Sequence, residues 1–163
     1  MNIPKFRGKD EKGNWHTGLL TFMFGQYAIV NEADENTIYL IDKDTIGQFT
    51  TKNDTKLNKE IFSGDIIEAS WGINYSDGYK PVRIYVGTVE LGEYEQDASG
   101  GEYSGASCIG FYGEFSVGAD DDRDFSKLDS YSYEKQQSLL RFDEIEVLGN
   151  IHDNPELLER FEK

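Results

Sequence analysis

The loop at residues 120–124 carries the residue types that bind calcium. Carboxylates fill the first three ligand positions of an EF-hand loop, at Asp120, Asp122 and Asp124. Such a loop also needs a central glycine for its sharp turn and a distal glutamate that binds the ion through both oxygens. Phe125 and Tyr131 stand at those two positions. We therefore predict a solvated acidic loop that binds divalent cations weakly and without specificity.

Nucleophilic catalysis has few candidate residues in this chain. Cys108 is the one cysteine, and the two histidines, His16 and His152, lie near opposite ends of the sequence. A thiol needs a base within hydrogen-bonding reach, and nothing in the sequence places either imidazole beside it. A structural Cys108 is the simpler interpretation, because free cysteine packs as a small apolar residue.

Other catalytic and cofactor motifs are incomplete. The sequence around Ser107 lacks the final glycine of a nucleophile elbow, because Ile109 stands in its place. The pair Gly100-Gly101 belongs to neither a phosphate-binding loop nor a dinucleotide fingerprint. One cysteine and two histidines form no zinc cluster without carboxylates, and HExxH is absent. We therefore expect no enzyme activity, no cofactor and no resident metal.

The charge of the chain is unevenly distributed. The net charge is −15; residues 1–64 hold eight basic and nine acidic side chains, and residues 65–163 hold eight basic and 22 acidic ones. A field of this sign repels nucleic-acid phosphates and anionic lipids and attracts basic proteins. The simpler alternative is that the acidic residues only confer solubility. A local basic cluster lies near the N-terminus, at Lys5, Arg7, Lys9 and Lys12.

Within the acidic half, carboxylates alternate at the end of a predicted strand. If the strand continues, Glu93, Glu95 and Asp97 share one face at spacings of about 6.7 Å and imitate a row of phosphates. The alternative is a solvated strand end that runs into a loop. Together with the acidic loop, this gives a candidate acidic interaction surface of Glu93, Glu95, Asp97, Asp120, Asp121, Asp122 and Asp124.

Composition indicates the class and compartment of the protein. A single cysteine excludes a disulfide within the chain and suits a reducing cytoplasm. The first residues lack the apolar segment of a signal peptide, and no apolar run approaches the roughly 20 residues of a membrane span. We expect a cytoplasmic protein that makes no membrane contact.

Turn residues and alternating polarity predict a mainly β fold. The first expected strands are Trp15 to Phe24, Tyr27 to Val30, Thr37 to Ile41 and Ile46 to Thr50. Gly64 is expected to take a positive φ in a turn before a strand from Ile66 to Trp71, and Gly87 marks a bulge in the strand from Val82 to Leu91. This arrangement predicts strands joined mainly by short polar turns.

The C-terminal third of the chain contains the clearest alternation of apolar and polar residues. One face of a strand, predicted to be buried, is formed by Ile109, Phe111, Phe115 and Val117. The segment from Tyr131 to Leu140 is ambiguous between a short helix and irregular structure, and Ile145, Val147 and Ile151 predict a further strand. The end is a short helix with Asn154 as cap and Pro155 in its first turn. Its apolar stripe, which we expect to dock on the β core, consists of Leu157, Leu158 and Phe161.

Several segments resemble the YopX-like proteins of bacteriophages and prophages. The start at residues 3–7 and the strand opening Gly87-Thr88-Val89 are similar to that family, but each match is weak alone. The central motif runs from Ile46 to Thr50 and then from Lys59 to Ile67. The closing motif runs from Ile145 to Leu158, with His152 where tyrosine is more usual. The central and closing motifs carry the resemblance by their order and spacing.

The resemblance implies a phage or prophage origin and a compact β-rich fold, and it implies no catalytic residue. A Gly-Asp turn into a strand is also similar to small SH3-like barrels, which is an analogy of fold only. We expect one domain: an N-terminal β-hairpin lobe over residues 1–45, a small SH3-like barrel or sandwich over residues 46–152, and a short helix over residues 153–163.

Three functions are compatible with these features. The first is a non-enzymatic protein that binds a host or phage protein with a basic surface. The second is a nucleic-acid-binding small β-barrel, which the charge opposes. The third is an enzyme that uses clustered carboxylates and a divalent metal, for which no complete motif exists. The sequence is also compatible with a homo-oligomer.

Overall fold

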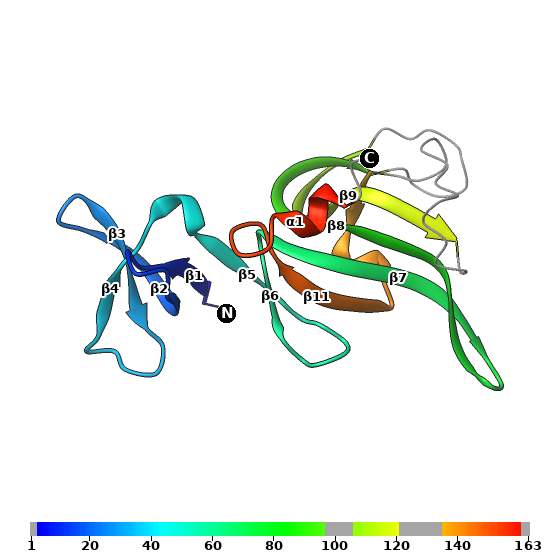
Figure 1. Ribbon diagram of the computed structural model, residues 1–163, viewed down its shortest axis with the longest axis horizontal. Coiled ribbons are helices and arrows are strands. Elements are labelled where there is room, and N and C mark those ends of the chain that lie inside the picture. Colours follow the sequence, from blue (N-terminus) through cyan, green and yellow to red (C-terminus); the bar gives the residue numbers. More distant parts are fainter. Residues whose placement is uncertain (1–2, 97–105, 121–134, 161–163) are drawn as a thin grey trace. The chain divides into compact units, whose positions relative to one another are not determined.

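The computed structural model of the protein describes residues 3–96, 106–120 and 135–160. The chain divides into two units, of which the first comprises Met1–Lys52 with Glu60–Ser63 and the second comprises Asn53–Lys59 with Gly64–Lys163. We call them the N-terminal and the C-terminal unit. Each unit is organised around one antiparallel sheet (Figure 1).

The N-terminal sheet has six strands in the order β4-β3-β2-β1-β5-β6. Its strands are β1 (Phe6–Lys9), β2 (Trp15–Met23), β3 (Gln26–Asn31), β4 (Ile38–Leu40), β5 (Gly47–Asn53) and β6 (Glu60–Phe62), with a 3-10 turn, η1, at Lys43–Thr45. The strands expected at Tyr27 to Val30 and Thr37 to Ile41 correspond to β3 and β4, which pair as an antiparallel hairpin. β5 pairs with β1, with Gln48 opposite Phe6, so this sheet continues beyond residue 45.

The C-terminal sheet has five strands in the order β10-β9-β8-β7-β11. Its elements are β7 (Asp65–Tyr75), β8 (Gly78–Gln96), β9 (Ala106–Asp120), β10 (Gln136–Ser138), the 3-10 turn η3 (Leu139–Arg141), β11 (Glu144–Asn150) and the helix α1 (Glu156–Glu159). The predicted mainly β fold with a short C-terminal helix is confirmed. Among the described residues this sheet does not close, because β10 and β11 form its two edges, and this fits the sandwich alternative and not a barrel.

Two glycines take the roles that the sequence predicts. Gly64 has a φ of +87° in the turn between β6 and β7, a region that favours residues without a side chain. Gly87 lies where the pairing of β8 with β9 shifts register, which confirms the bulge. A Cβ at Gly87 would lie 2.1 Å from the carbonyl oxygen of Glu114, so the close approach of the two strands requires glycine there.

The core of the C-terminal unit centres on three aromatic rings. Tyr85, Phe115 and Phe142 are all buried, and their ring centroids lie 5.3 to 5.7 Å apart in tilted and edge-on contacts. Such contacts stabilise a core beyond the area that they bury. The rings come from β8, β9 and the residue after η3, so they connect three separate segments of the chain.

The prediction that Ile109 is buried is wrong. Phe115 is buried as predicted, but the Ile109 side chain is 87% exposed. The pairing of β7 with β8 extends only to the Ile66–Thr88 pair, whereas β8 and β9 remain paired as far as Gln96 and Ala106. Ile109 therefore lies on a ribbon that extends past β7, where alternation no longer implies burial on one face.

The closing motif forms a hydrogen-bonded turn after β11. The Asn150 side-chain oxygen accepts hydrogen bonds from the backbone N–H groups of His152 and Asp153, at 3.0 and 2.9 Å. Asn154 does not cap the helix with its side chain; its oxygen accepts from the Asn150 N–H at 3.3 Å. Asn154, which the sequence predicts as the helix cap, therefore stabilises the turn after β11 with its side chain.

The helix α1 is shorter than predicted and has no side-chain cap. It covers Glu156–Glu159 after Pro155, and Leu157 and Leu158 are half-buried. Phe161 lies outside the described residues. The ambiguous segment before β11 forms β10 and η3 in its described part, residues 135–140.

Replacing Asn150 with alanine is expected to destabilise the C-terminal unit by about 1–3 kcal/mol, because two N–H groups in partly buried hydrogen bonds lose their acceptor. Urea denaturation followed by circular dichroism measures the change. Asn74→Ala, at an exposed position of the same unit, is the control and should change stability by less than about 0.5 kcal/mol. Equal effects of the two substitutions would show that the closing turn is not a stabilising element.

Within the described ranges, the chain has no helix with the length and apolar character needed to span a membrane.

Candidate interaction surfaces

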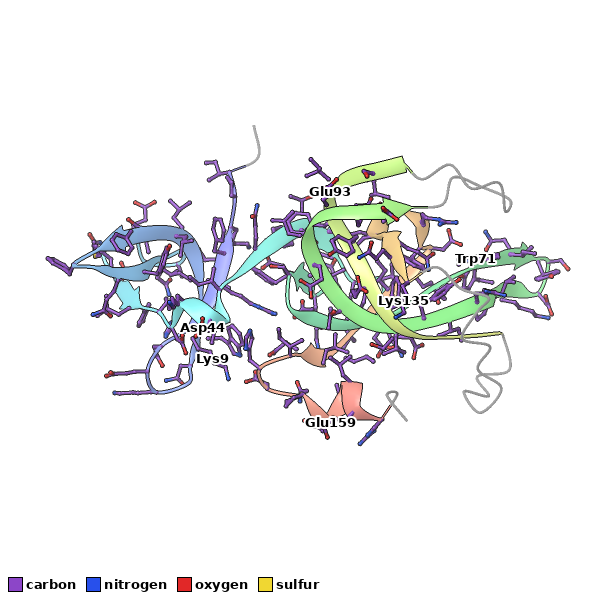
Figure 2. All side chains as sticks on the ribbon, turned by 90° about the horizontal axis from the view of Figure 1, so that it is seen from above. Lys9, Asp44, Trp71, Glu93, Lys135 and Glu159 are labelled. Carbon is purple, nitrogen blue, oxygen red and sulfur yellow. The ribbon has the colours of Figure 1, made fainter. Side chains whose placement is uncertain are left out.

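Two carboxylates of the predicted row, those of Glu93 and Glu95, lie on the ribbon of β8 and β9. Both side chains are exposed, and they precede and follow the buried Tyr94 in β8. Figure 2 shows Glu93 on this strand. The partners of the two glutamates across the ribbon are Ile109 and Ser107. The face that carries them is therefore mixed, with an exposed isoleucine beside the two carboxylates.

Most of the predicted acidic loop lies outside the described residues. Asp120 ends β9 opposite Arg83, and its side chain is not described. Four residues of the candidate surface lie outside the residues that the structure describes: Asp97, Asp121, Asp122 and Asp124. The structure therefore places only Glu93 and Glu95 of the predicted surface together.

A second acidic surface lies over β7 and β11. A cavity of about 210 Å³ is lined there by Glu68 and Ser70 from β7 and by Glu144 and Glu146 from β11, together with Lys56. In the register of the two strands Glu68 stands opposite Glu146 and Ser70 stands opposite Glu144. All four side chains therefore project from the same face of the sheet, and we call this cavity the glutamate groove.

The charges of the glutamate groove are only partly balanced. Like charges directly opposite each other on paired strands repel. Lys56 Nζ lies 2.8 Å from a Glu146 carboxylate oxygen and offsets part of this repulsion. Three carboxylates and one ammonium group line the groove, so its net charge favours a cationic ligand.

The loop at residues 53–59 holds one wall of the glutamate groove in place. Thr55 forms two hydrogen bonds with the backbone of Ile145: its N–H donates to the Ile145 carbonyl at 2.8 Å, and its side-chain hydroxyl accepts from the Ile145 N–H at 3.0 Å. Asp54 accepts from the Val147 N–H at 3.3 Å and from the N–H groups of Leu57 and Lys59 in its own loop. These bonds fix Thr55 and Lys56 beside β11.

Asp54 is ionised in this environment. Burial opposes the charge, but the hydrogen bonds from the backbone of Leu57, Val147 and Lys59 lower the pKa of its carboxyl below the usual value. A carboxylate that accepts several backbone N–H groups is a strong clamp because the bonds are charge-assisted.

Two tyrosines of the C-terminal unit have raised pKa values because of burial and nearby carboxylates. Burial raises the pKa of Tyr79, and the charges of Asp143 and Glu144 raise it further. Burial likewise raises the pKa of Tyr112, followed by the charges of Glu114 and Glu90. Both phenols therefore lie near carboxylates in surroundings that exclude part of the solvent.

The sequence analysis missed the glutamate groove. Glu144 and Glu146 alternate with Ile145 and Val147, and this signal marks them as outward-facing. Their approach to Glu68 depends on the pairing of β11 with β7, which are far apart in the sequence. No local pattern predicts that pairing.

The basic cluster of the N-terminal unit is interleaved with aromatic rings. The Arg7 guanidinium lies 4.8 Å from the Trp15 ring centroid and 4.9 Å from that of Phe62. Lys9 Nζ lies 5.2 Å from the Trp15 ring, and Lys5 Nζ lies 5.1 Å from that of Phe49. Lys5 also pairs with Glu32 and Glu60. These cations are half-buried, and the carboxylates reduce their attraction for phosphate.

The candidates for catalysis are dispersed. His16 stacks on Tyr39 with ring centroids 3.5 Å apart, and its Nε2 lies 2.8 Å from Asp10, within the N-terminal unit. Cys108 is half-buried in the C-terminal unit, opposite Tyr94. In the part of the chain that the structure describes, no three His, Cys, Asp or Glu side chains are arranged to hold a metal ion.

Comparison with known proteins shows the family of the chain. The family model described as YopX protein matches residues 5–159 of the chain. Searches of the curated proteins and of the solved structures each gave no match. The matched range includes both units and the closing turn around Asn150.

Proposed function

The chain belongs to the YopX protein family, and on this premise we propose that it is a non-enzymatic accessory protein of a phage or prophage. It acts in the cytoplasm of the bacterial host by binding a host or phage protein that has a basic surface. The observation that carries this proposal is the glutamate groove, where three carboxylates line one cavity. The charge of residues 65–163, which hold 22 acidic and eight basic side chains, supports the proposal.

An arginine or lysine side chain of the partner would enter the glutamate groove. A guanidinium group presents several N–H donors in a plane and pairs well with carboxylates on two sides. Surrounding carboxylates would accelerate the encounter, and this contribution would decrease as salt screens them. Glu93 and Glu95, on the ribbon of β8 and β9, are a separate pair of exposed carboxylates in the same unit.

The alternative is binding of single-stranded nucleic acid by the basic cluster of β1. Arg7 and Lys9 flank the Trp15 ring, and cations beside aromatic rings occur in sites that track a nucleic-acid backbone and stack its bases. The net charge of −15 and the pairing of Lys5 with two glutamates weigh against this alternative.

The double substitution Glu144→Gln with Glu146→Gln is expected to weaken binding of a fluorescent hexa-arginine peptide by about tenfold, because it removes two carboxylates of the groove. Fluorescence anisotropy at about 150 mM salt measures the affinity. Labelled duplex and single-stranded DNA, measured in the same buffer, should show no binding.

The matched control carries Glu156→Gln with Glu159→Gln, which removes the same charge from α1, and it should bind the peptide like the unmodified chain. A third variant, Glu93→Gln with Glu95→Gln, measures the contribution of the predicted row. Equal losses in all three variants would show that only net charge matters and would contradict the groove. Sub-micromolar DNA binding would support the alternative function instead.

A further inference from the structure

The N-terminal sheet has an open edge at β4. β4 is the last strand in the order of this sheet, and among the residues that the structure describes it pairs only with β3 (Figure 1). The Asn31 N–H donates to the Thr37 carbonyl, and the Ile41 N–H donates to the Tyr27 carbonyl, both at 2.9 Å. The odd-numbered residues of this segment therefore turn their backbone groups towards β3.

The backbone of Ile38 and Leu40 consequently faces away from β3. Successive residues of a strand direct their N–H and C=O groups to opposite sides, so these two residues present donors and acceptors at the edge. An exposed strand edge of this kind is a template for pairing with another strand. β-Strand addition by an extended peptide uses such groups for affinity and alternate side-chain contacts for specificity.

A groove lies beside this edge as far as Asp42, whose own backbone N–H already donates to the Lys9 carbonyl at 2.8 Å. Its volume is about 630 Å³, and five consecutive residues from Ile38 to Asp42 line it, together with Gln26 and the turn at residues 10–12. The side chains of Ile38 and Leu40 are 44% and 47% exposed. In the register of the sheet they lie opposite Val30 and Ala28, so an added strand would extend an apolar face that already exists.

Acidic residues stand at both ends of the edge. Asp34 and Glu35 precede β4, and Asp42 and Asp44 follow it. A hydrogen bond from the Thr37 hydroxyl lowers the pKa of Asp34, so this carboxyl is ionised at neutral pH.

The far wall of the groove is also acidic. It includes Asp10, whose pKa is lowered to about 2 by its hydrogen bond with His16, and the exposed Glu11. Lys12 in this wall and Lys43 beside Asp42 balance only part of this charge.

The charges select between two occupants. If two copies of the chain paired through β4 in antiparallel orientation, Asp34 and Glu35 of one copy would approach Asp42 and Asp44 of the other. Like charges across paired strands are destabilising. A strand with basic residues at its ends would instead meet opposite charge at both ends of β4.

We propose that the β4 edge binds, by strand addition, an extended segment of another protein that is apolar at alternate positions and basic at both ends. The segment would exchange backbone hydrogen bonds with Ile38 and Leu40 and place its apolar side chains beside theirs. This surface belongs to the N-terminal unit and is independent of the glutamate groove.

The test uses the full isotope-labelled chain and a capped peptide, acetyl-Arg-Arg-Val-Thr-Val-Thr-Val-Arg-Arg-amide. In an NMR titration, the amide signals of Ile38 and Leu40 should shift and become protected from hydrogen exchange. Methylating the valine nitrogens removes the donors that would face β4, and this peptide should bind about tenfold more weakly. A peptide with glutamate in place of arginine should also bind more weakly.

Matched variants of the chain locate the site. Leu40→Lys should weaken binding by about tenfold, because it removes an apolar contact and repels the arginine ends. Leu19→Lys is the control: Leu19 is 51% exposed on the same face of the sheet, but β2 is separated from the edge by β3 and β4. Leu19→Lys and the glutamate groove variant should both bind the peptide like the unmodified chain.

Three outcomes would overturn the proposal. The first is the absence of any shift at Ile38 and Leu40 at about 1 mM peptide, a concentration at which even weak strand addition is visible. The second is unchanged binding of the methylated peptide. The third is a concentration-dependent dimer in sedimentation experiments that Leu40→Lys dissociates, since the edge would then be assigned to a second copy of the chain.

Discussion

Replacing Asp54 with alanine is expected to destabilise the C-terminal unit by about 3–5 kcal/mol. Asp54 is only 3% exposed, and its carboxylate accepts hydrogen bonds from the backbone N–H groups of Leu57, Lys59 and Val147, among others. Alanine leaves these donors without their acceptor in a position that water reaches poorly. The loop at residues 53–59 also loses one of its attachments to β11.

The effect of Asp54→Ala should depend on pH. The hydrogen bonds lower the pKa of Asp54 in the folded state, so its ionised form stabilises the fold at every pH above the carboxyl pKa of the unfolded chain. This contribution is lost as the pH falls through the lowered pKa of the folded state. The difference in stability between the unmodified chain and the variant should therefore be full at pH 7 and decrease below about pH 4.

Tryptophan fluorescence measures the stability of the C-terminal unit separately. The chain has two tryptophans, Trp15 in the N-terminal unit and Trp71 in the C-terminal unit. In a Trp15→Phe background, urea denaturation followed by fluorescence reports Trp71 alone. Asp77→Ala is the matched control, because Asp77 pairs with Lys80 at an exposed turn and should contribute less than about 1 kcal/mol. A loss no greater than that of the control would contradict the role assigned to Asp54.

Replacing Phe115 with alanine should also destabilise the C-terminal unit by about 3–5 kcal/mol. Its ring is 1% exposed and lies between those of Tyr85 and Phe142. Alanine removes the burial of a large apolar surface and leaves a cavity that the strands of a sheet cannot easily close. We expect the melting temperature, measured by calorimetry, to fall by at least about 10 °C.

The control for Phe115→Ala is Leu140→Ala, which truncates an apolar residue that is exposed in the same unit. Its effect should be within about 0.5 kcal/mol. Phe115→Leu retains much of the buried apolar volume and should fall between the two. A fall in melting temperature of only a few degrees for Phe115→Ala would show that the three rings do not form the centre of this core.

These two substitutions distinguish stability from binding. Phe115 lies in the core and does not line the glutamate groove, whereas Asp54 holds Thr55 and Lys56 beside it. Under conditions in which both variants remain folded, only Asp54→Ala should change the affinity for the arginine peptide. This comparison tests whether the loop at residues 53–59 positions the groove as well as stabilising the unit.

Local sequence was sufficient to predict much of the secondary structure. Alternating side chains and turn residues located β2, β3, β4, β7 and β8, because strand faces and tight turns depend on neighbours in the chain. Gly64 and Gly87 were predictable for the same reason: a positive φ and a bulge both favour a residue without a Cβ. The acidic excess of residues 65–163 also follows directly from composition, and the central and closing motifs were sufficient to indicate the family.

Only the tertiary structure decided how these parts meet. Glu68 faces Glu146 because β11 pairs with β7, and Asp54 reaches Val147 because its loop packs on the same strand. Ile109 is exposed because the ribbon of β8 and β9 extends past β7, and Asn154 bonds to Asn150 instead of capping α1. Alternation specifies the two faces of a strand but not which strand pairs with it or what covers each face. Those choices depend on contacts between residues far apart in the sequence, and no local pattern encodes them.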